Sequence, residues 1–280
     1  MRTINVNNVV EVVEKLCIDA NYFLNSDIMD ALKSCHISEE SDIGKEILNQ
    51  IIENAEIAKV ENMAMCQDTG MVIAFVELGQ EIHIEGGSLT SAIYEGVRRG
   101  YEKGYLRKSV VRDPIDRVNT GDNTPAVIHY DLVEGDRLKI TIAPKGFGSE
   151  NMSALKMLKP SDGVEGIKKF VFDTVSSAGP NPCPPIVVGV GIGGTMEKAA
   201  QLSKKALLRS VDQRSELEHI KSLEKELLDG INKLGIGPAG LGGRSTALAV
   251  NIEVFPTHIA GLPVAVNISC HATRHAEVEL

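Results

Sequence analysis

The stretch Met65-Cys66-Gln67-Asp68-Thr69-Gly70 leads directly into the apolar run Met71–Val76. It places a thiol, an amide, a carboxylate and a hydroxyl in succession, after a helical pattern that ends near Asn62. A short apolar run bounded by a polar turn predicts a strand, so the polar residues form a loop that leads into it. Binding and catalytic residues concentrate on loops that rigid elements hold. This loop is therefore the first candidate for a functional site.

The composition of the 280-residue chain limits the possible partners. Its hydrophobic fraction of 43% is ample for a buried core. The formal net charge of -9 argues against a nucleic acid or an anionic membrane as the main partner, although a local basic pocket could still bind a small anion. No apolar run is long enough to span a bilayer, and Met1–Val6 lacks the apolar segment of a signal peptide. We therefore expect a cytoplasmic protein.

Periodic patterns predict the elements of the first half. Apolar residues at three- and four-residue spacing predict helices from Val6 to Asn62, with a break near His36–Ser41. A strand over 71–78 and a helix over 89–103, with Ser88 as N-cap, come next. After a long loop over 106–125, strands over 126–133 and 137–143 are joined by Glu134-Gly135-Asp136. This short connection predicts an antiparallel hairpin.

The second half alternates between the two kinds of element. The patterns predict helices over 164–177, 195–208 and 217–233, and strands over 186–192, 247–255 and 264–268. The predicted fold class is mixed α/β, close to α+β, in one domain of residues 1–280. An N-terminal helical layer over 1–62 is followed, over 63–280, by mixed and antiparallel strands with surrounding helices.

The cysteines fall into two groups. Five cysteines at irregular spacing do not form a disulfide framework, so we expect reduced thiols. Cys17 and Cys35 lie in helical patterns and are interpreted as structural. Cys66, Cys183 and Cys270 lie in irregular surroundings beside glycine, proline or serine. Such positions suit a ligand that points into a site from a loop.

The run Gly189-Val190-Gly191-Ile192-Gly193-Gly194 satisfies G-x-G-x-x-G between a predicted strand and a predicted helix. A dinucleotide-binding domain normally begins with this unit and continues with strand-helix alternation. Here another helix follows the first one. We interpret the glycines as a close strand-to-helix turn, and a nucleotide-binding module remains the less favoured alternative.

Two other chemistries fit the loop cysteines less well. A nucleophilic Cys66 or Cys183 would need a histidine base, but no motif orders such a pair and two loop cysteines would stay unexplained. Zinc usually requires closely spaced ligands such as C-x-x-C, and the sequence contains none. Three isolated loop cysteines better fit an iron-sulfur cluster with one open iron, since electron-transfer clusters commonly use four. An open iron acts as a Lewis acid on a hydroxyl or carboxylate oxygen.

Several motifs together resemble the alpha subunit, or N-terminal domain, of class I iron-sulfur fumarate hydratases. In chain order they are Cys66–Gly70, Asn119–Pro125, Lys145–Ser149, Cys183–Pro185 and Gly193–Thr195. The related L-tartrate dehydratase alpha subunit shares much of this pattern, and the resemblance covers nearly the whole chain. It implies the fold of that family and a 4Fe-4S cluster bound by Cys66, Cys183 and Cys270. The implied reaction is the reversible hydration of fumarate to L-malate, a step of the tricarboxylic acid cycle.

The resemblance also assigns roles to single residues. Asp68 matches a proposed acid/base residue, and Gln67 matches its active-site neighbour. Arg107 matches an arginine that binds a substrate carboxylate, Gly148 a glycine whose backbone faces substrate, and His258 a histidine near the substrate. Structural alternatives are a turn cap for Asp68, a solvated charge for Arg107 and a core position for His258.

The resemblance further implies a partner chain. One-chain members of the family continue into a second domain, which resembles a separate beta subunit in two-subunit members and carries further substrate-binding residues. Because this sequence ends at Leu280, soon after Cys270, we expect a beta subunit to complete the site in a hetero-oligomer that acts on a small dicarboxylate. The residues do not decide between fumarate and L-tartrate.

Overall fold

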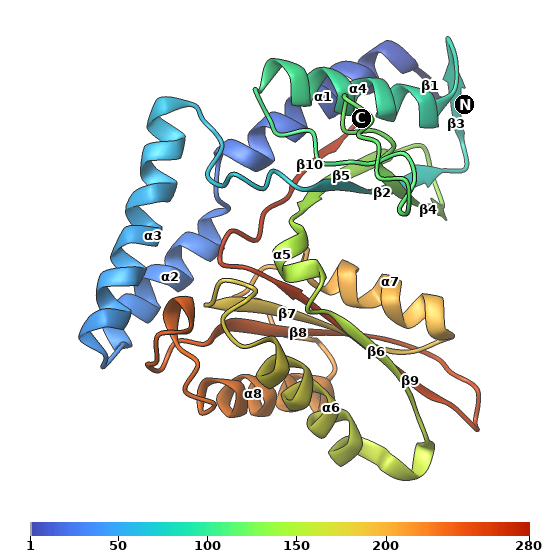
Figure 1. The fold of residues 1–280 in the computed structure, drawn as a ribbon. Coiled ribbons are helices and arrows are strands. Elements are labelled where there is room, and N and C mark those ends of the chain that lie inside the picture. Colours follow the sequence, from blue (N-terminus) through green and yellow to red (C-terminus); the bar gives the residue numbers. More distant parts are fainter. Residues whose placement is uncertain (1) are drawn as a thin grey trace. The chain divides into compact units, whose positions relative to one another are not determined.

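The computed structural model describes residues 2–280, which form a mixed α+β fold as predicted (Figure 1). The chain divides into two compact units. Unit 1 consists of the segment that ends at Leu24, of Ala55–Phe147 and of Arg274–Leu280, and unit 2 consists of Asn25–Asn54 and Gly148–Thr273. The division falls within helices α3 (Asp42–Glu61) and α5 (Phe147–Glu150).

Unit 1 is built on a sheet with strand order β10-β5-β2-β4. Its strands are β2 (Met71–Gly79), β4 (Val127–Val133), β5 (Leu138–Lys145) and β10 (Ala276–Glu279). A small parallel pair joins β1 (Arg2–Asn5) to β3 (Ile82–Glu85). Helices α1 (Val6–Tyr22) and α4 (Leu89–Lys103) run alongside each other and share the core of this unit with the strands. Sequence analysis missed β1, β3 and β10, each only four residues long.

Two glycines of α4 allow it to approach α1 closely. A Cβ on Gly96 would lie 2.6 Å from the Cβ of Val13, and one on Gly100 would lie 2.8 Å from the Cβ of Cys17. As predicted, Ser88 caps α4, accepting a hydrogen bond from the backbone N–H of Ser91, and Gly104 follows its last residue. The two helices therefore pack tightly in the core of unit 1.

The predicted hairpin between 126–133 and 137–143 is wrong, because β2 lies between β4 and β5. Val76 of β2 pairs with Tyr130 of β4 in a parallel ladder and with Ile140 of β5 in an antiparallel ladder. The turn signal correctly marks the end of one strand and the start of the next. Pairing, however, depends on which strand is buried deeply enough to occupy the centre of the sheet, and β2 is the more apolar and the more deeply buried choice.

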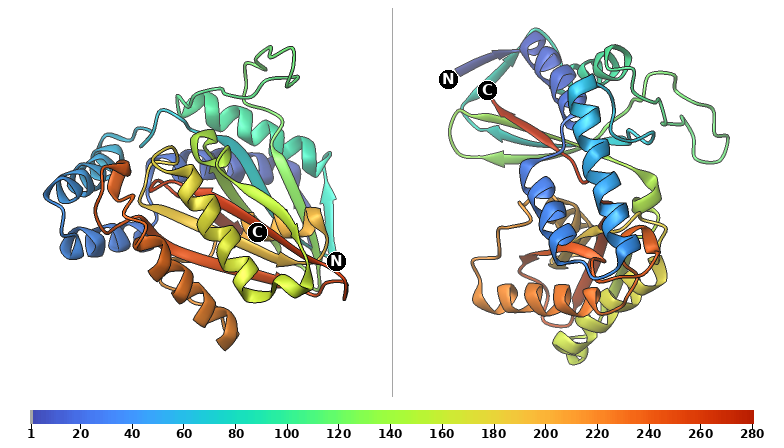
Figure 2. Two further views of the ribbon diagram at one scale, coloured as in Figure 1. Left: turned by 60° about the horizontal axis from the view of Figure 1, so that its bottom comes forward. Right: turned by 90° about the vertical axis from the view of Figure 1, so that its left-hand side faces the viewer.

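Unit 2 contains a second sheet with strand order β6-β9-β7-β8. Its strands are β6 (Ala154–Leu158), β7 (Ile186–Gly193), β8 (Ala247–Phe255) and β9 (Leu262–Ser269). β7 pairs parallel with β8 and antiparallel with β9. Helices α6 (Gly163–Ala178) and α8 (Glu218–Asn232) cover one face of this sheet, and α7 (Met196–Ala206) covers the other (Figures 1 and 2). β6 was not predicted.

Close packing of α7 explains the glycine-rich run in β7. A Cβ on Gly189 would lie 2.1 Å from the carbonyl oxygen of Ser203, and one on Gly191 would lie 2.1 Å from that of Ala199. Val188 and Val190, which alternate with these glycines along the strand, face the core beneath α6 and α8. These two glycines therefore lie inside a buried strand rather than in a phosphate-binding turn, and helix packing accounts for them.

Within the described residues, none of the helices has the length and apolar character needed to cross a bilayer.

Glu39 is a buried carboxylate that organises a loop of unit 2. It follows α2 (Ser26–Ser38) and accepts hydrogen bonds from the backbone N–H groups of Arg244 at 2.9 Å, Ser245 at 2.8 Å and Ser41 at 3.1 Å. Burial by itself raises the pKa of Glu39, but the bonds from these N–H groups outweigh it and lower the pKa to about 2. The ionised form is thus the one that fits the fold.

We expect Glu39→Gln to lower the free energy of unfolding at pH 7 by on the order of 1–3 kcal/mol, because an uncharged amide replaces an acceptor of several bonds. A depressed pKa contributes stability that is present above the unfolded value of 4.5 and is lost as pH falls toward about 2. Urea unfolding between pH 7 and pH 2.5 measures both effects. Glu40→Gln, at an exposed neighbour, is the control. Identical pH profiles of the wild type and Glu39→Gln would contradict this account.

Candidate functional site

In unit 1, a pocket of about 460 Å³ brings together Cys66, Gln67 and Arg107. Cys66 is half-buried, whereas Gln67 and Arg107 are exposed. The hydroxyl of Thr69 donates a 3.1 Å hydrogen bond to the carbonyl oxygen of Arg107. A direct contact therefore holds the predicted loop beside the predicted arginine, although Cys66 and Arg107 are 41 positions apart in sequence.

Buried side chains hold three consecutive carbonyl groups of this loop. Arg274 Nη2 donates to the Asp68 oxygen at 2.6 Å, and the Tyr101 hydroxyl donates to the Thr69 oxygen at 2.6 Å. The Asn123 amide donates to the Gly70 oxygen at 3.1 Å. Burial raises the pKa of Tyr101, so its hydroxyl keeps the proton that it donates.

Sequence analysis missed Tyr101, Asn123 and Arg274. Asn123 belongs to a motif that carries the resemblance, but nothing in the linear sequence showed that its side chain reaches Gly70. In the sequence, Tyr101 looks like an ordinary apolar position of α4, because its hydroxyl bonds only to residues far away in the chain. A buried tyrosine, asparagine or arginine needs a partner, and that need is visible only once burial is known.

Asp68 uses both carboxylate oxygens to hold the backbone. Oδ1 accepts from the N–H of Gly70 at 3.0 Å, and Oδ2 accepts from the N–H of Phe147 at 2.9 Å. Asp68 therefore caps a turn, as the structural alternative predicted. It also ties the Cys66–Gly70 loop to the segment that follows β5. An acid/base role of Asp68 stays a prediction, because an ionised carboxylate has further lone pairs to offer.

We expect Asp68→Asn to destabilise unit 1 by about 1–3 kcal/mol, because an amide NH₂ would face one of the two N–H donors. If Asp68 also moves a proton, turnover per intact cluster falls by a further hundredfold to ten-thousandfold, roughly. Thermal unfolding and turnover, measured on one sample with iron and sulfide content, separate the two effects. Asp113→Asn is the matched control, because Oδ1 of Asp113 alone accepts both local bonds. Lower stability with normal turnover would leave Asp68 a cap only.

In unit 2, Cys183 and Cys270 lie at the same end of the sheet. Cys183 precedes β7 and Cys270 follows β9, and the antiparallel register pairs Val187 with Ser269. His271 joins the two segments, because its backbone N–H donates to the Cys183 oxygen at 3.4 Å and its Nδ1 lies 3.0 Å from the same oxygen. A carbonyl only accepts, so Nδ1 carries a proton. The two contacts hold the His271 segment against the backbone of Cys183.

Gly148 lies in α5, beside the segment that precedes Cys183. Among the described residues, only the carbonyl oxygen of Asn181 lies within 4 Å of a Cβ built on Gly148, and it lies at 3.8 Å. Packing in the chain therefore does not require a glycine here. A close approach by a ligand to this backbone stays a prediction.

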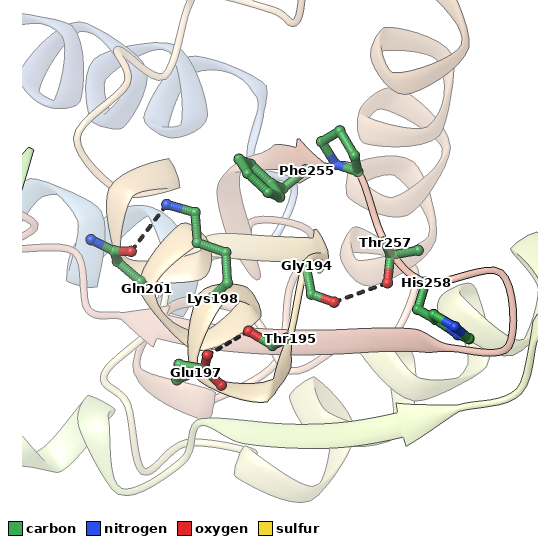
Figure 3. Close-up of a pocket in the computed structure, with 9 residues that line it drawn as sticks. Gly194, Thr195, Glu197, Lys198, Gln201, Phe255, Thr257 and His258 are labelled. Atoms are coloured by element: carbon green, nitrogen blue, oxygen red, sulfur yellow. Dashed lines mark hydrogen bonds between the residues drawn. The ribbon is translucent and has the colours of Figure 1, made fainter. Parts of the chain in front are cut away.

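His258 lies at the opposite end of the unit 2 sheet from Cys183 and Cys270. It lines a pocket of about 580 Å³ with Gly194, Thr195 and Lys198 (Figure 3). The eight residues of β7 separate this end from the cysteine end, a span of about 25 Å. His258 is exposed, so it is not a core residue, and the structure does not bring it to the cysteines of its own unit. Its role in substrate binding stays a prediction.

The three loop cysteines are divided between the two units: Cys66 belongs to unit 1, and Cys183 and Cys270 belong to unit 2. None of the five cysteines forms a disulfide. Burial raises the pKa of Cys17 and of Cys35, which disfavours the thiolate form that metals bind. No group of three His, Cys, Asp or Glu side chains in residues 2–280 is arranged for one ion. Thiols are the donors that iron-sulfur clusters take, and ligation by Cys66, Cys183 and Cys270 stays a prediction.

Comparison with known proteins accords with this arrangement. A protein of Methanocaldococcus jannaschii, provisionally named L(+)-tartrate dehydratase subunit alpha, is 48% identical over 272 residues, 95% of each chain. The L(+)-tartrate dehydratase alpha subunits of Escherichia coli (strain K12) and Shigella sonnei are each 36% identical, over 96% of this chain and 89% of theirs. The sequence model described as Fumarate hydratase (Fumerase) matches residues 10–279. That match takes in both units with their three loop cysteines, and the chain therefore belongs to the fumarate hydratase (Fumerase) family.

Proposed function

We propose that this chain is the alpha subunit of an iron-sulfur hydro-lyase that dehydrates L(+)-tartrate together with a beta subunit. One observation carries the choice of substrate: the relatives at 36% and 48% identity all bear the name L(+)-tartrate dehydratase subunit alpha. The family resemblance implied fumarate as the substrate, with L-tartrate as the alternative. The names of the relatives favour that alternative.

The unit 1 pocket offers part of a dicarboxylate site. The guanidinium of Arg107 presents paired N–H donors that suit a carboxylate, and the amide of Gln67 can bond a hydroxyl or a carboxylate oxygen. Among the residues that line this pocket, Arg107 is the only one with a permanent charge. A dianionic substrate needs further cations, which supports a partner subunit that contributes them.

The proposed cofactor is a 4Fe-4S cluster bound by Cys66, Cys183 and Cys270. When bound, it supplies an open iron as a Lewis acid for the hydroxyl that leaves as water. The chain's own residues would hold it from loops: the Cys66 loop is fixed by the carbonyl contacts of unit 1, and His271 fixes the backbone of Cys183. The proposal requires one thiol from unit 1 and two from unit 2.

The decisive experiment is an anaerobic assay of the chain reconstituted with its cognate beta chain. L(+)-tartrate, L-malate and fumarate are offered separately. The keto acid formed from L(+)-tartrate, the alkene formed from L-malate and the alkene consumed from fumarate are followed. We expect kcat/KM for L(+)-tartrate to exceed that for L-malate at least tenfold, and the alpha chain alone to be inactive. Faster interconversion of fumarate and L-malate would restore the fumarate assignment. No turnover of any of the three by an assembled, cluster-loaded enzyme would overturn the proposal.

A further inference from the structure

Arg274 is a buried cation without a counter-charge. Its side chain belongs to a residue that is only 5% exposed, and Nη2 donates to the carbonyl oxygen of Asp68. Its Nε–H is buried and has no hydrogen-bond partner. No carboxylate of residues 2–280 forms an ion pair with it, although the chain carries a net charge of -9.

This situation is unusual, because a buried charge is normally paired. Arg209 of unit 2 follows that rule: its guanidinium pairs with Glu224 and Glu253. Asp68 is the acidic residue that Arg274 touches, but the contact is to its backbone oxygen, and the carboxylate is already bonded to two backbone N–H groups. The chain's own carboxylates therefore do not neutralise Arg274.

Arg274 and the carbonyl group that it bonds both lie close in sequence to proposed cluster ligands. The guanidinium is 2.6 Å from the carbonyl of Asp68, which is two residues after Cys66. Arg274 is itself four residues after Cys270, whose carbonyl accepts the N–H of Thr273 in a tight turn. Cys270 is thus close to Arg274 in sequence, and Cys66 is close to the carbonyl group that Arg274 bonds.

We infer that Arg274 supplies the positive charge that compensates the thiolate-ligated cluster. The inference rests on the proposed function. A 4Fe-4S core with three thiolate ligands carries a net negative charge, and nearby charge is one of the factors that set the reduction potential of such clusters. Because Arg274 is buried, solvent does not screen it as it would a surface arginine. The cation therefore favours cluster binding and the reduced state of the cluster.

The test compares Arg274→Met with Arg274→Lys in the assembled enzyme. Methionine removes the charge at similar length, and lysine keeps it. Arg137→Met, which removes the same charge from an exposed position of unit 1, is the matched control. The measurements are the unfolding temperature with and without cluster, the rate of iron loss to a chelator, and the midpoint reduction potential of the cluster.

We expect three results for Arg274→Met. Iron loss becomes at least tenfold faster, and the midpoint potential becomes more negative. The unfolding temperature falls more in the cluster-loaded than in the cluster-free protein, which loses only the hydrogen bond to the Asp68 carbonyl. Arg274→Lys should retain most of the wild-type behaviour, and Arg137→Met all of it.

A merely structural arginine would behave differently. Arg274→Met would then lower the unfolding temperatures of the cluster-free and cluster-loaded proteins equally and leave the potential unchanged, which overturns the inference. A wild-type enzyme that binds no iron and sulfide would overturn the proposed cofactor, and with it the inference, before any variant is compared. The two failures are thus distinguishable.

Discussion

Alanine at Cys66, Cys183 or Cys270 will reduce cluster content and turnover to background, whereas Cys35→Ala will retain both. A thiolate is the ligand that iron requires, and a methyl group cannot replace it. The variants are reconstituted anaerobically with the beta chain, and iron, sulfide and visible absorbance are measured for each protein.

Cys35 is a suitable control for these ligand variants, because its thiol lies in α2 and burial raises its pKa. Cys17→Ala should also keep the cluster, with a modest loss of stability from the core of unit 1. Equal cluster content in all five single variants would remove the ligand assignment. Loss in only two of the three loop variants would require a different third ligand.

Gly70→Ala is expected to have the largest effect on stability of any single substitution in the Cys66–Gly70 loop. Gly70 has a φ of 77°, and a Cβ there would lie 2.7 Å from the backbone nitrogen and 2.8 Å from the carbonyl carbon of Lys145. Neither backbone atom can move without breaking the ladder between β2 and β5, in which Met71 pairs with Lys145. We expect the free energy of unfolding to fall by about 3–5 kcal/mol, because steric overlap adds to backbone strain.

Gly121→Ala separates these two causes. Gly121 has a similar φ of 82°, but none of the described atoms lies within 4 Å of a Cβ built there. Backbone strain alone should lower the free energy of unfolding of Gly121→Ala by about 1–2 kcal/mol. Urea unfolding of both variants gives the difference, and equal losses would show that the close approach of Lys145 does not constrain the loop.

The local elements of this protein follow from short stretches of sequence. The helix after Ser88 begins and ends where its cap and Gly104 predict, and the strands over 71–78 and 247–255 are present as expected. These features depend on interactions between residues a few positions apart. The grouping of Cys66, Cys183 and Cys270 as loop residues, apart from the helical Cys17 and Cys35, rests on the same local signals and is confirmed.

Features that depend on distant residues were decided by the tertiary structure. Local turn chemistry could not show that β2 separates β4 from β5, because strand order depends on which strand is buried most deeply. The glycines of β7 are needed for contact with α7, a requirement that exists only after the helix has packed.

Long-range contacts also decide which predicted site residues lie together. Gln67 and Arg107 share a pocket because a long-range bond from Thr69 joins their segments, whereas His258 lies at the far end of a strand from the cysteines of its unit. Residue types and their order indicate which chemistry a chain can perform. Which side chains meet, and which buried charge lacks a partner, as at Arg274, depends on burial and packing that only the folded chain creates.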